Sequence, residues 1–305
     1  MIGKVDKKEI IASLIMVLFF LVIHGIALFL AGPFEEAGVK TFENPEDPLN
    51  IAFILIILLA FTGIILLIAK FWKKRVIHLI VLGAIGYTSA YVFYPVFNMI
   101  FTEIFSLILA IIAAVVIVLL IFYYPEWYIL DLCGIVVGAG AIAIFGISLS
   151  IPLVILLLSV LSVYDAISVY KTKHMVDLAD TVMDLKLPVL LVVPKVRNYS
   201  LLKKDMSLKA NLKKDKERDA FFVGLGDVVM PGILVVSVFH NIPHALFLSL
   251  GVILGTLVGF AVLMTFVIKG RPQAGLPSLC GGAIAGYLVF SLLLFGKIVG
   301  FSGVS

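Results

Sequence analysis

Residues 151–170 read IPLVILLLSVLSVYDAISVY, an apolar run of membrane-spanning length that carries a single carboxylic acid, Asp165. About 20 apolar residues in a helix are enough to cross the hydrocarbon core of a bilayer. Residues 219–239 form a second such run, and Asp227 lies inside it. An ionisable side chain within a span is costly and usually has a function. The two runs therefore indicate a membrane protein with two buried acids whose presence needs an explanation.

The composition of the whole chain is that of a multi-pass membrane protein. Hydrophobic residues make up 62% of its 305 residues and charged residues only 14%, and the mean hydropathy is +1.20. Soluble domains have roughly 45–50% apolar and 25% charged residues. We predict one all-α membrane domain over residues 1–305, with nine transmembrane helices. The predicted spans are 9–32, 50–71, 76–100, 104–124, 127–148, 151–170, 219–239, 246–268 and 275–298.

The positive charges are distributed unevenly between the two sides of this arrangement. All of the 23 lysines and arginines except Lys40 and Lys297 lie on the side of the amino terminus. Such an excess is typical of cytoplasmic loops. We therefore expect the amino terminus and the polar loop 171–218 in the cytoplasm and the carboxyl terminus outside, in a protein of the cell membrane. The formal net charge of +4 is explained by these loops, so no nucleic-acid partner is expected.

Asp165 and Asp227 are expected at similar depths in consecutive antiparallel helices. Asp165 precedes the end of its span near Tyr170 by five residues, and Asp227 follows the start of the next span by about seven. At 1.5 Å per residue, the two acids are about 7 Å and about 10 Å from the same membrane face. Two close carboxyls in a low dielectric cannot both ionise cheaply, so one can act as acid and the other as base. Activation of water against a peptide carbonyl requires such a pair.

The neighbours of the two acids suit a functional site. Gly224, Leu225 and Gly226 precede Asp227 directly, and the two glycines leave a helix face on which another backbone can approach. Glycine pairs also serve ordinary helix packing. Tyr164, beside Asp165, could donate a hydrogen bond or only fill space. No HExxH sequence is present, so we expect no metal and no cofactor.

These segments resemble the motifs of a known family. Tyr164-Asp165 and Gly224-Leu225-Gly226-Asp227 are similar to the YD and GxGD motifs of presenilin and signal peptide peptidase aspartyl proteases, and the chain resembles an archaeal-type presenilin homologue. The family's Pro-Ala-Leu motif falls on Ala274-Gly275-Leu276, followed by Pro277, so its first two positions differ. The resemblance implies an intramembrane aspartic endopeptidase with Asp165 and Asp227 as catalytic residues. It also implies supporting roles for the other motif residues, Leu276 and Pro277 included.

The resemblance also implies the class of substrate. The orientation inferred from Lys and Arg matches presenilins, which implies single-span membrane proteins reached through the lipid bilayer. Obligate protein subunits are not evident from the sequence. The alternative function is a proton- or cation-coupled transporter or channel, because intramembrane acids often form relays. Cleavage of a membrane reporter would separate the two classes of protein.

One segment of the polar loop has the character of a β-strand. The residues Val189, Leu190, Leu191, Val192 and Val193 are mostly β-branched, lie between prolines and are too few to span a membrane. We predict that this strand pairs with an extended part of the substrate beyond the cleaved bond. Leu276 and Pro277 are expected to offer a second backbone edge from the other side.

Two further ionisable residues lie inside predicted spans. His24 is expected to be a hydrogen-bonded structural histidine, since no second His or Cys lies near it in sequence. Asp131 follows the aromatic residues around Trp127, which are typical of the membrane interface. We therefore expect Asp131 to reach lipid headgroups or water.

Overall fold

The computed structural model describes residues 7–71, 74–172, 189–195, 199–201, 220–267 and 273–301. Nine long helices lie within these ranges, one for each predicted span. They are α1 (Lys7–Glu36), α2 (Leu49–Phe71), α3 (Lys74–Asn98), α4 (Glu103–Tyr123), α5 (Trp127–Ser148), α6 (Ile151–Ile167), α9 (Leu225–Asn241), α10 (Leu246–Val267) and α11 (Gly275–Phe295). One π-helical turn, η1 (Ser168–Thr172), continues α6. Of the loop 171–218, only 171–172, 189–195 and 199–201 are among the described residues.

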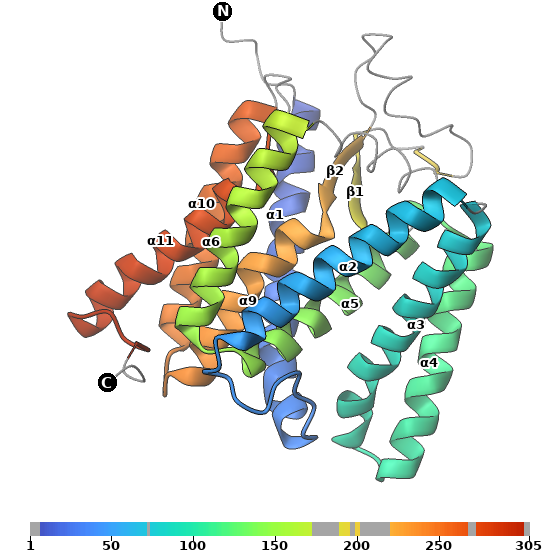
Figure 1. Ribbon diagram of the computed structural model, residues 1–305, viewed down its shortest axis with the longest axis horizontal. Helices are drawn as coiled ribbons and strands as arrows, with labels where there is room; N and C mark the ends of the chain where they lie inside the picture. The colour runs from blue at the N-terminus through green and yellow to red at the C-terminus, as the bar shows by residue number, and fades with distance from the viewer. Residues whose placement is uncertain are drawn as a thin grey trace, which may run out of the picture.

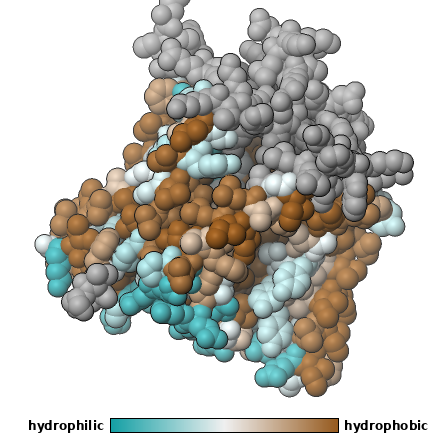
Figure 2. Space-filling view, viewed as in Figure 1, coloured by the Kyte–Doolittle hydropathy of each residue, from teal (hydrophilic) through white to brown (hydrophobic). Residues whose placement is uncertain are grey.

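The helices have the length and surface of membrane spans. Within the described residues, seven helices are long and apolar enough to cross a bilayer. Large apolar side chains such as Ile108, Ile112 and Val115 of α4 are exposed. Figure 2 shows apolar side chains over the helices and hydrophilic ones gathered towards the lower edge of the view. The protein is therefore an integral, multi-pass membrane protein.

Helix α9 lies at the centre of the helical arrangement. Figure 1 shows α3 and α4 as a pair on one side and α10 and α11 as a pair on the other. Between these pairs, α9 contacts α1, α5, α6, α10 and α11, and its residues from Pro231 to Val238 are all buried. Small residues of α5 permit this approach, because Gly138 faces Leu225 and Gly146 faces Val236. The position of α9 is thus determined by packing along most of its length.

Helices α10 and α11 approach until their backbones touch. A Cβ atom added at Gly255 would lie 2.2 Å from the carbonyl oxygen of Gly282, and one at Gly259 would lie 2.2 Å from that of Ser278. Small residues four apart on both helices permit such contact, which is a common way for membrane helices to associate. This contact fixes the position of α11, including its amino end.

Substitution of Gly255 by Ala should therefore be strongly destabilising. The added methyl group would meet backbone atoms, which cannot move aside as a flexible side chain can, so we expect a loss of about 1–3 kcal/mol in the free energy of unfolding. Thermal unfolding in detergent measures this loss. Gly83→Ala is the matched control, because no atom lies within 4 Å of the added Cβ position. Equal stability of the two variants would contradict the close packing of α10 on α11.

Besides the helices of the predicted all-α fold, the described residues contain two short strands that pair with each other. Strand β1 (Leu190–Pro194) is antiparallel to β2 (Ala220–Gly224), with Leu191 opposite Val223. The strand predicted at 189–193 is therefore confirmed with a shift of one residue. The helix predicted from 219 begins only at Leu225, because Ala220–Gly224 pair with β1 as a strand.

The hairpin formed by β1 and β2 packs against apolar side chains on both faces, with β1 mostly buried and β2 mostly half-buried. Leu191 and Val193 belong to the main apolar core, and Phe221 and Val223 pack against it. The alternate residues Leu190 and Phe222 pack on a second cluster built from α3, α4 and α5, which includes Leu82, Ile121 and Cys133. Alternation of side chains along a strand explains this division. The hairpin is thus held between two apolar clusters at the amino end of α9.

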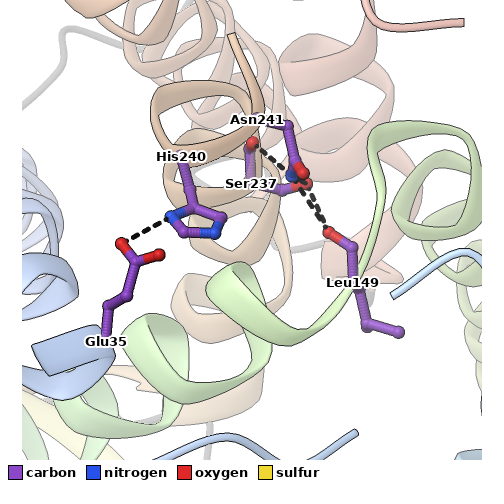
Figure 3. Close-up of polar contacts among 5 residues, drawn as sticks. All are labelled: Glu35, Leu149, Ser237, His240 and Asn241. Atoms are coloured by element: carbon purple, nitrogen blue, oxygen red, sulfur yellow. Dashed lines mark hydrogen bonds and ion pairs between the residues drawn. The ribbon is translucent and has the colours of Figure 1, made fainter. Parts of the chain in front are cut away.

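The opposite end of α9 is anchored by polar contacts (Figure 3). The Ser237 hydroxyl donates a hydrogen bond to the Leu149 carbonyl over 2.8 Å, and the Asn241 side-chain amide donates to the same oxygen over 3.3 Å. Leu149 is the C-cap of α5, where carbonyl groups lack a helical donor. His240 lies 3.4 Å from Glu35 near the end of α1. Helix α9 is therefore held at both ends, by these contacts and by the hairpin.

Candidate active site

Asp165 projects from the last turn of α6 and is only 3% exposed. The backbone N–H of Leu276 donates a hydrogen bond to Asp165 Oδ2 over 3.1 Å. Leu276 lies in the first turn of α11, where backbone N–H groups have no helical acceptor and the helix dipole is positive. The amino end of α11 therefore provides a favourable position for a carboxylate.

Ser162, one helical turn before Asp165 in α6, also contacts Leu276 of α11. Its hydroxyl donates to the Leu276 carbonyl over 3.4 Å, so α6 binds the main chain of Leu276 through both its N–H and its C=O. Sequence reasoning did not identify Ser162. The available signal was its position three residues before Asp165, which places both side chains on one helix face.

Asp227 lies in the first turn of α9, and its carboxyl fits between two glycines. A Cβ atom at Gly275 would be 2.6 Å from Asp227 Oδ2, and one at Gly224 would be 3.4 Å from it. Gly275, which lies against Asp227, directly precedes Leu276, whose N–H binds Asp165. The structure thus brings the two acids together at the amino end of α11, one from α6 and one from α9.

The other residues of the GxGD segment have distinct surroundings. Gly226 is exposed, and no atom of the described residues lies within 4 Å of its Cβ position. The side chain of Leu225 instead packs against Gly138 of α5. Gly226 therefore leaves the space beside Asp227 open to another chain, whereas Leu225 holds the segment in place.

Tyr164 does not take part in the polar contacts of the two acids. Its side chain is 48% exposed, and its hydroxyl makes no hydrogen bond to the described part of the chain. In this structure Tyr164 thus neighbours Asp165 in sequence without contributing to its polar surroundings.

The third motif forms the start of α11. Ala274 is the N-cap, and Pro277 lies in the first turn, where its missing N–H has no helical acceptor to lose. Gly275 replaces the alanine of the family motif, at the point where a methyl group would press on Asp227. The Leu276 amide is not free for a substrate here, because it binds Asp165. Both backbone groups of Leu276 are thus paired with α6 in this structure, and a second backbone edge at Leu276 and Pro277 stays a prediction.

Comparison with known proteins identifies the family. The chain matches the family described as signal-peptide peptidase, presenilin aspartyl protease over residues 16–296. The chain belongs to this family. Two similar solved structures are described as a presenilin family intramembrane aspartate protease, in space groups C222 and P2. The first is 34% identical with a TM-score of 0.63, covering 90% of this chain and 94% of that one. The second is 36% identical with a TM-score of 0.65, covering 91% of this chain and 96% of that one. No curated protein matches.

These findings establish an intramembrane aspartic endopeptidase of the presenilin and signal peptide peptidase family. Proteases of this family act on membrane proteins within the bilayer. The predicted family and activity are therefore confirmed.

The expectation for Asp131 is wrong. Its side chain is buried, with 3% exposure, and Oδ1 accepts a hydrogen bond from the backbone N–H of Val192 over 2.7 Å. The neighbouring Trp127 suggested contact with headgroups, but the hairpin covers Asp131 instead. The signal for this was the presence of an acid inside a predicted span, which usually indicates a function.

His24 is buried, as its structural interpretation requires. Its Nε2 lies 3.2 Å from the Val228 carbonyl oxygen, and a Cβ atom at Gly232 would lie 2.9 Å from the His24 ring. The histidine therefore joins α1 to the first turns of α9 beside Asp227.

Proposed function

We propose that this protease hydrolyses peptide bonds of single-span membrane proteins, with Asp165 and Asp227 as its acid–base pair. The convergence of the two carboxyls at the amino end of α11 is the observation that supports the assignment most directly. Because two adjacent carboxyls in an apolar site cannot both ionise cheaply, the pair carries one proton in its active form.

In the proposed reaction, the ionised carboxylate takes a proton from a water molecule as the water oxygen attacks the peptide carbonyl carbon. The protonated carboxyl gives its proton to the carbonyl oxygen, and a tetrahedral diol forms. In its breakdown, the acid that took the water proton gives it to the amide nitrogen, the other carboxylate takes a proton from one diol hydroxyl, and the C–N bond breaks. The products are a new carboxyl terminus and a new amino terminus, and the pair of acids again holds one proton.

A substrate that enters as a helix must be extended before it can be cut, because helical peptide bonds are hydrogen-bonded and shielded. The sequence predicted that the strand at 189–193 would pair with the extended substrate, but this strand, β1, already pairs with β2. Within the part of the chain that the structure describes, no strand pairs with the edge of β2 that faces away from β1. The Leu225 N–H donates a hydrogen bond to the Val189 carbonyl over 2.9 Å. In an antiparallel pair of strands, every second pair of opposite residues is hydrogen-bonded, so Leu191 and Val223 also form a hydrogen-bonded pair.

Phe222 therefore directs its N–H and C=O away from β1. Within the described residues, neither group makes a hydrogen bond on that outward side. We assign substrate pairing to this edge of β2, while Val189–Val193 support β2 from its inner side. Main-chain pairing gives affinity with little sequence preference. Since β2 leads directly into Gly224 and Asp227, an added strand would continue towards the acids.

We further propose that the nine helices all span the membrane, with the amino terminus in the cytoplasm and the carboxyl terminus outside. The distribution of Lys and Arg supports this orientation. The same orientation favours the cell membrane as the location and type I single-span proteins as substrates. We propose that these are cleaved without obligate subunits.

Cleavage of a single-span substrate by the purified protease should follow a bell-shaped pH profile. At low pH both acids are protonated and no base is available, and at high pH both are ionised and no acid remains. Initial rates measured across the pH range in detergent test this expectation, with thermal unfolding at each pH as the control for stability. A flat profile in a folded protein would contradict the shared-proton mechanism, and absence of cleavage would favour a transport function.

A further inference from the structure

Asp131 is a buried acid that the catalytic reaction does not use. It lies in α5, and its Oδ1 accepts the Val192 N–H over 2.7 Å. Within the described residues its Oδ2 is buried and has no hydrogen-bond partner. A buried carboxyl with an unpaired oxygen is costly for stability. Its cost indicates a role other than stabilising the fold.

The pairing of the strands shows what the contact of Asp131 does. Leu191 and Val193 bond to β2, so the N–H of Val192 points to the outer side of β1. An unpaired N–H on an outer strand is a site at which another strand can add. Asp131 occupies the N–H of Val192, and Pro194 at the next outward position has none. Two of the three outward positions of β1 therefore offer no free N–H to a further strand.

Residues that follow β1 in the chain make further polar contacts with neighbouring helices. Glu126, which precedes α5, accepts hydrogen bonds from the Ser200 hydroxyl over 2.6 Å and the Leu201 N–H over 3.1 Å. Lys195, directly after β1, lies 3.4 Å from Glu9 of α1 and 4.2 Å from the ring centre of Phe221. The side of β1 is thus bound to α5 and α1, whereas the outer edge of β2 has no such attachment within the described residues.

We propose that Asp131 is a positioning residue of the protease, which closes β1 and holds the hairpin so that an extended substrate adds only along β2. This inference rests on the proposed function, because it presupposes strand addition beside Asp227. Loss of the contact would let the hairpin shift relative to α9 and would open a second edge. Substrate would then bind more weakly and in more than one register, while the two catalytic acids keep their surroundings.

The test compares Asp131→Ala with Asp131→Asn in the purified protease, using a single-span substrate. Asparagine keeps an oxygen acceptor for Val192, so its KM and its cleavage positions should stay close to those of the wild type. Alanine leaves the Val192 N–H unpaired, so KM should rise roughly tenfold. Mass spectrometry should show additional cleavage positions, and kcat should change much less than KM.

Ser148→Ala is the matched control. Ser148 lies at the other end of α5 and accepts the backbone N–H of Thr41 over 2.8 Å, so its loss also removes a side-chain acceptor for a loop amide. It should lower thermal stability without changing KM or the cleavage positions. If Asp131→Ala does not fold, Val192→Pro removes the donor while leaving the bonds between β1 and β2. It should give the same rise in KM from the shifted hairpin but no additional cleavage positions, because proline offers no N–H for a second edge.

Two outcomes would overturn the proposal. One is that Asp131→Ala, like Ser148→Ala, loses only stability while KM and the cleavage positions stay unchanged. The other is that asparagine behaves like alanine. Neither outcome touches the proposed function, which stands on cleavage by the wild type and its loss in Asp165→Asn. Hydrogen exchange adds a readout without substrate, because the amides of residues 189–195 should exchange faster in Asp131→Ala than in Asp131→Asn.

Discussion

Replacement of Asp227 by Asn should reduce cleavage by on the order of 10³-fold or more, and replacement of Asp165 by Asn should do the same. Asparagine has nearly the shape of aspartate but can neither take nor give the proton that the reaction moves, and general acid–base groups contribute about this much to rate. Initial cleavage rates of each purified variant measure the effect. The two losses should not add in the double variant, because the acids act as a unit.

Thermal unfolding of each variant is the control for these rates. Asp165 accepts the Leu276 amide, and an asparagine oxygen can accept it too, so the amino end of α11 should keep its place. Folded variants that retain more than a tenth of the wild-type rate would rule out the corresponding residue as a catalytic acid or base.

Replacement of Leu191 by Pro should reduce cleavage at least tenfold while both acids remain intact. Leu191 is a bonded partner of Val223, so proline removes an N–H from the ladder between β1 and β2. Strand β2 would then lose the partner that keeps its outer edge straight for the substrate. The measurement is the cleavage rate of a single-span substrate relative to that of Leu191→Ala.

Leu191→Ala is the matched control because Leu191 is buried and proline also removes its side chain. Alanine removes the same apolar contacts but keeps the N–H, so the difference between the two variants isolates the ladder. Val192→Pro is the complementary variant, since its missing N–H faces Asp131 and leaves the ladder intact. If Leu191→Pro cleaves as fast as Leu191→Ala, strand support has no part in catalysis.

The helices could be predicted from the sequence because each rests on a local property, a long apolar run. For the same reason the meeting of Asp165 and Asp227 could be anticipated, since depth follows from position in a span. The start of α9 could not, because Ala220–Gly224 are apolar enough to continue a span and only their pairing with β1 makes them a strand. Tertiary pairing overrides local preference in this segment.

The contacts of the site depended on packing that no local pattern reveals. Gly275 departs from the family motif, and its meaning appears only when α11 lies against Asp227. Asp131 was expected to face headgroups because its neighbours in sequence are aromatic, but its partner Val192 is distant along the chain. Ser162 likewise acquires its partner only through the approach of α6 and α11. Such long-range contacts require the fold to be known.

The most direct test of the central claim is mass spectrometry of a single-span membrane protein incubated with the purified protease in detergent. The account predicts two fragments whose new termini lie within the substrate's transmembrane segment and together restore the full sequence plus one water. The same incubation with Asp227→Asn should leave the substrate intact. An intact substrate with the folded wild-type protein, or equal fragments with Asp227→Asn, would contradict the assignment of Asp165 and Asp227 as the acid–base pair.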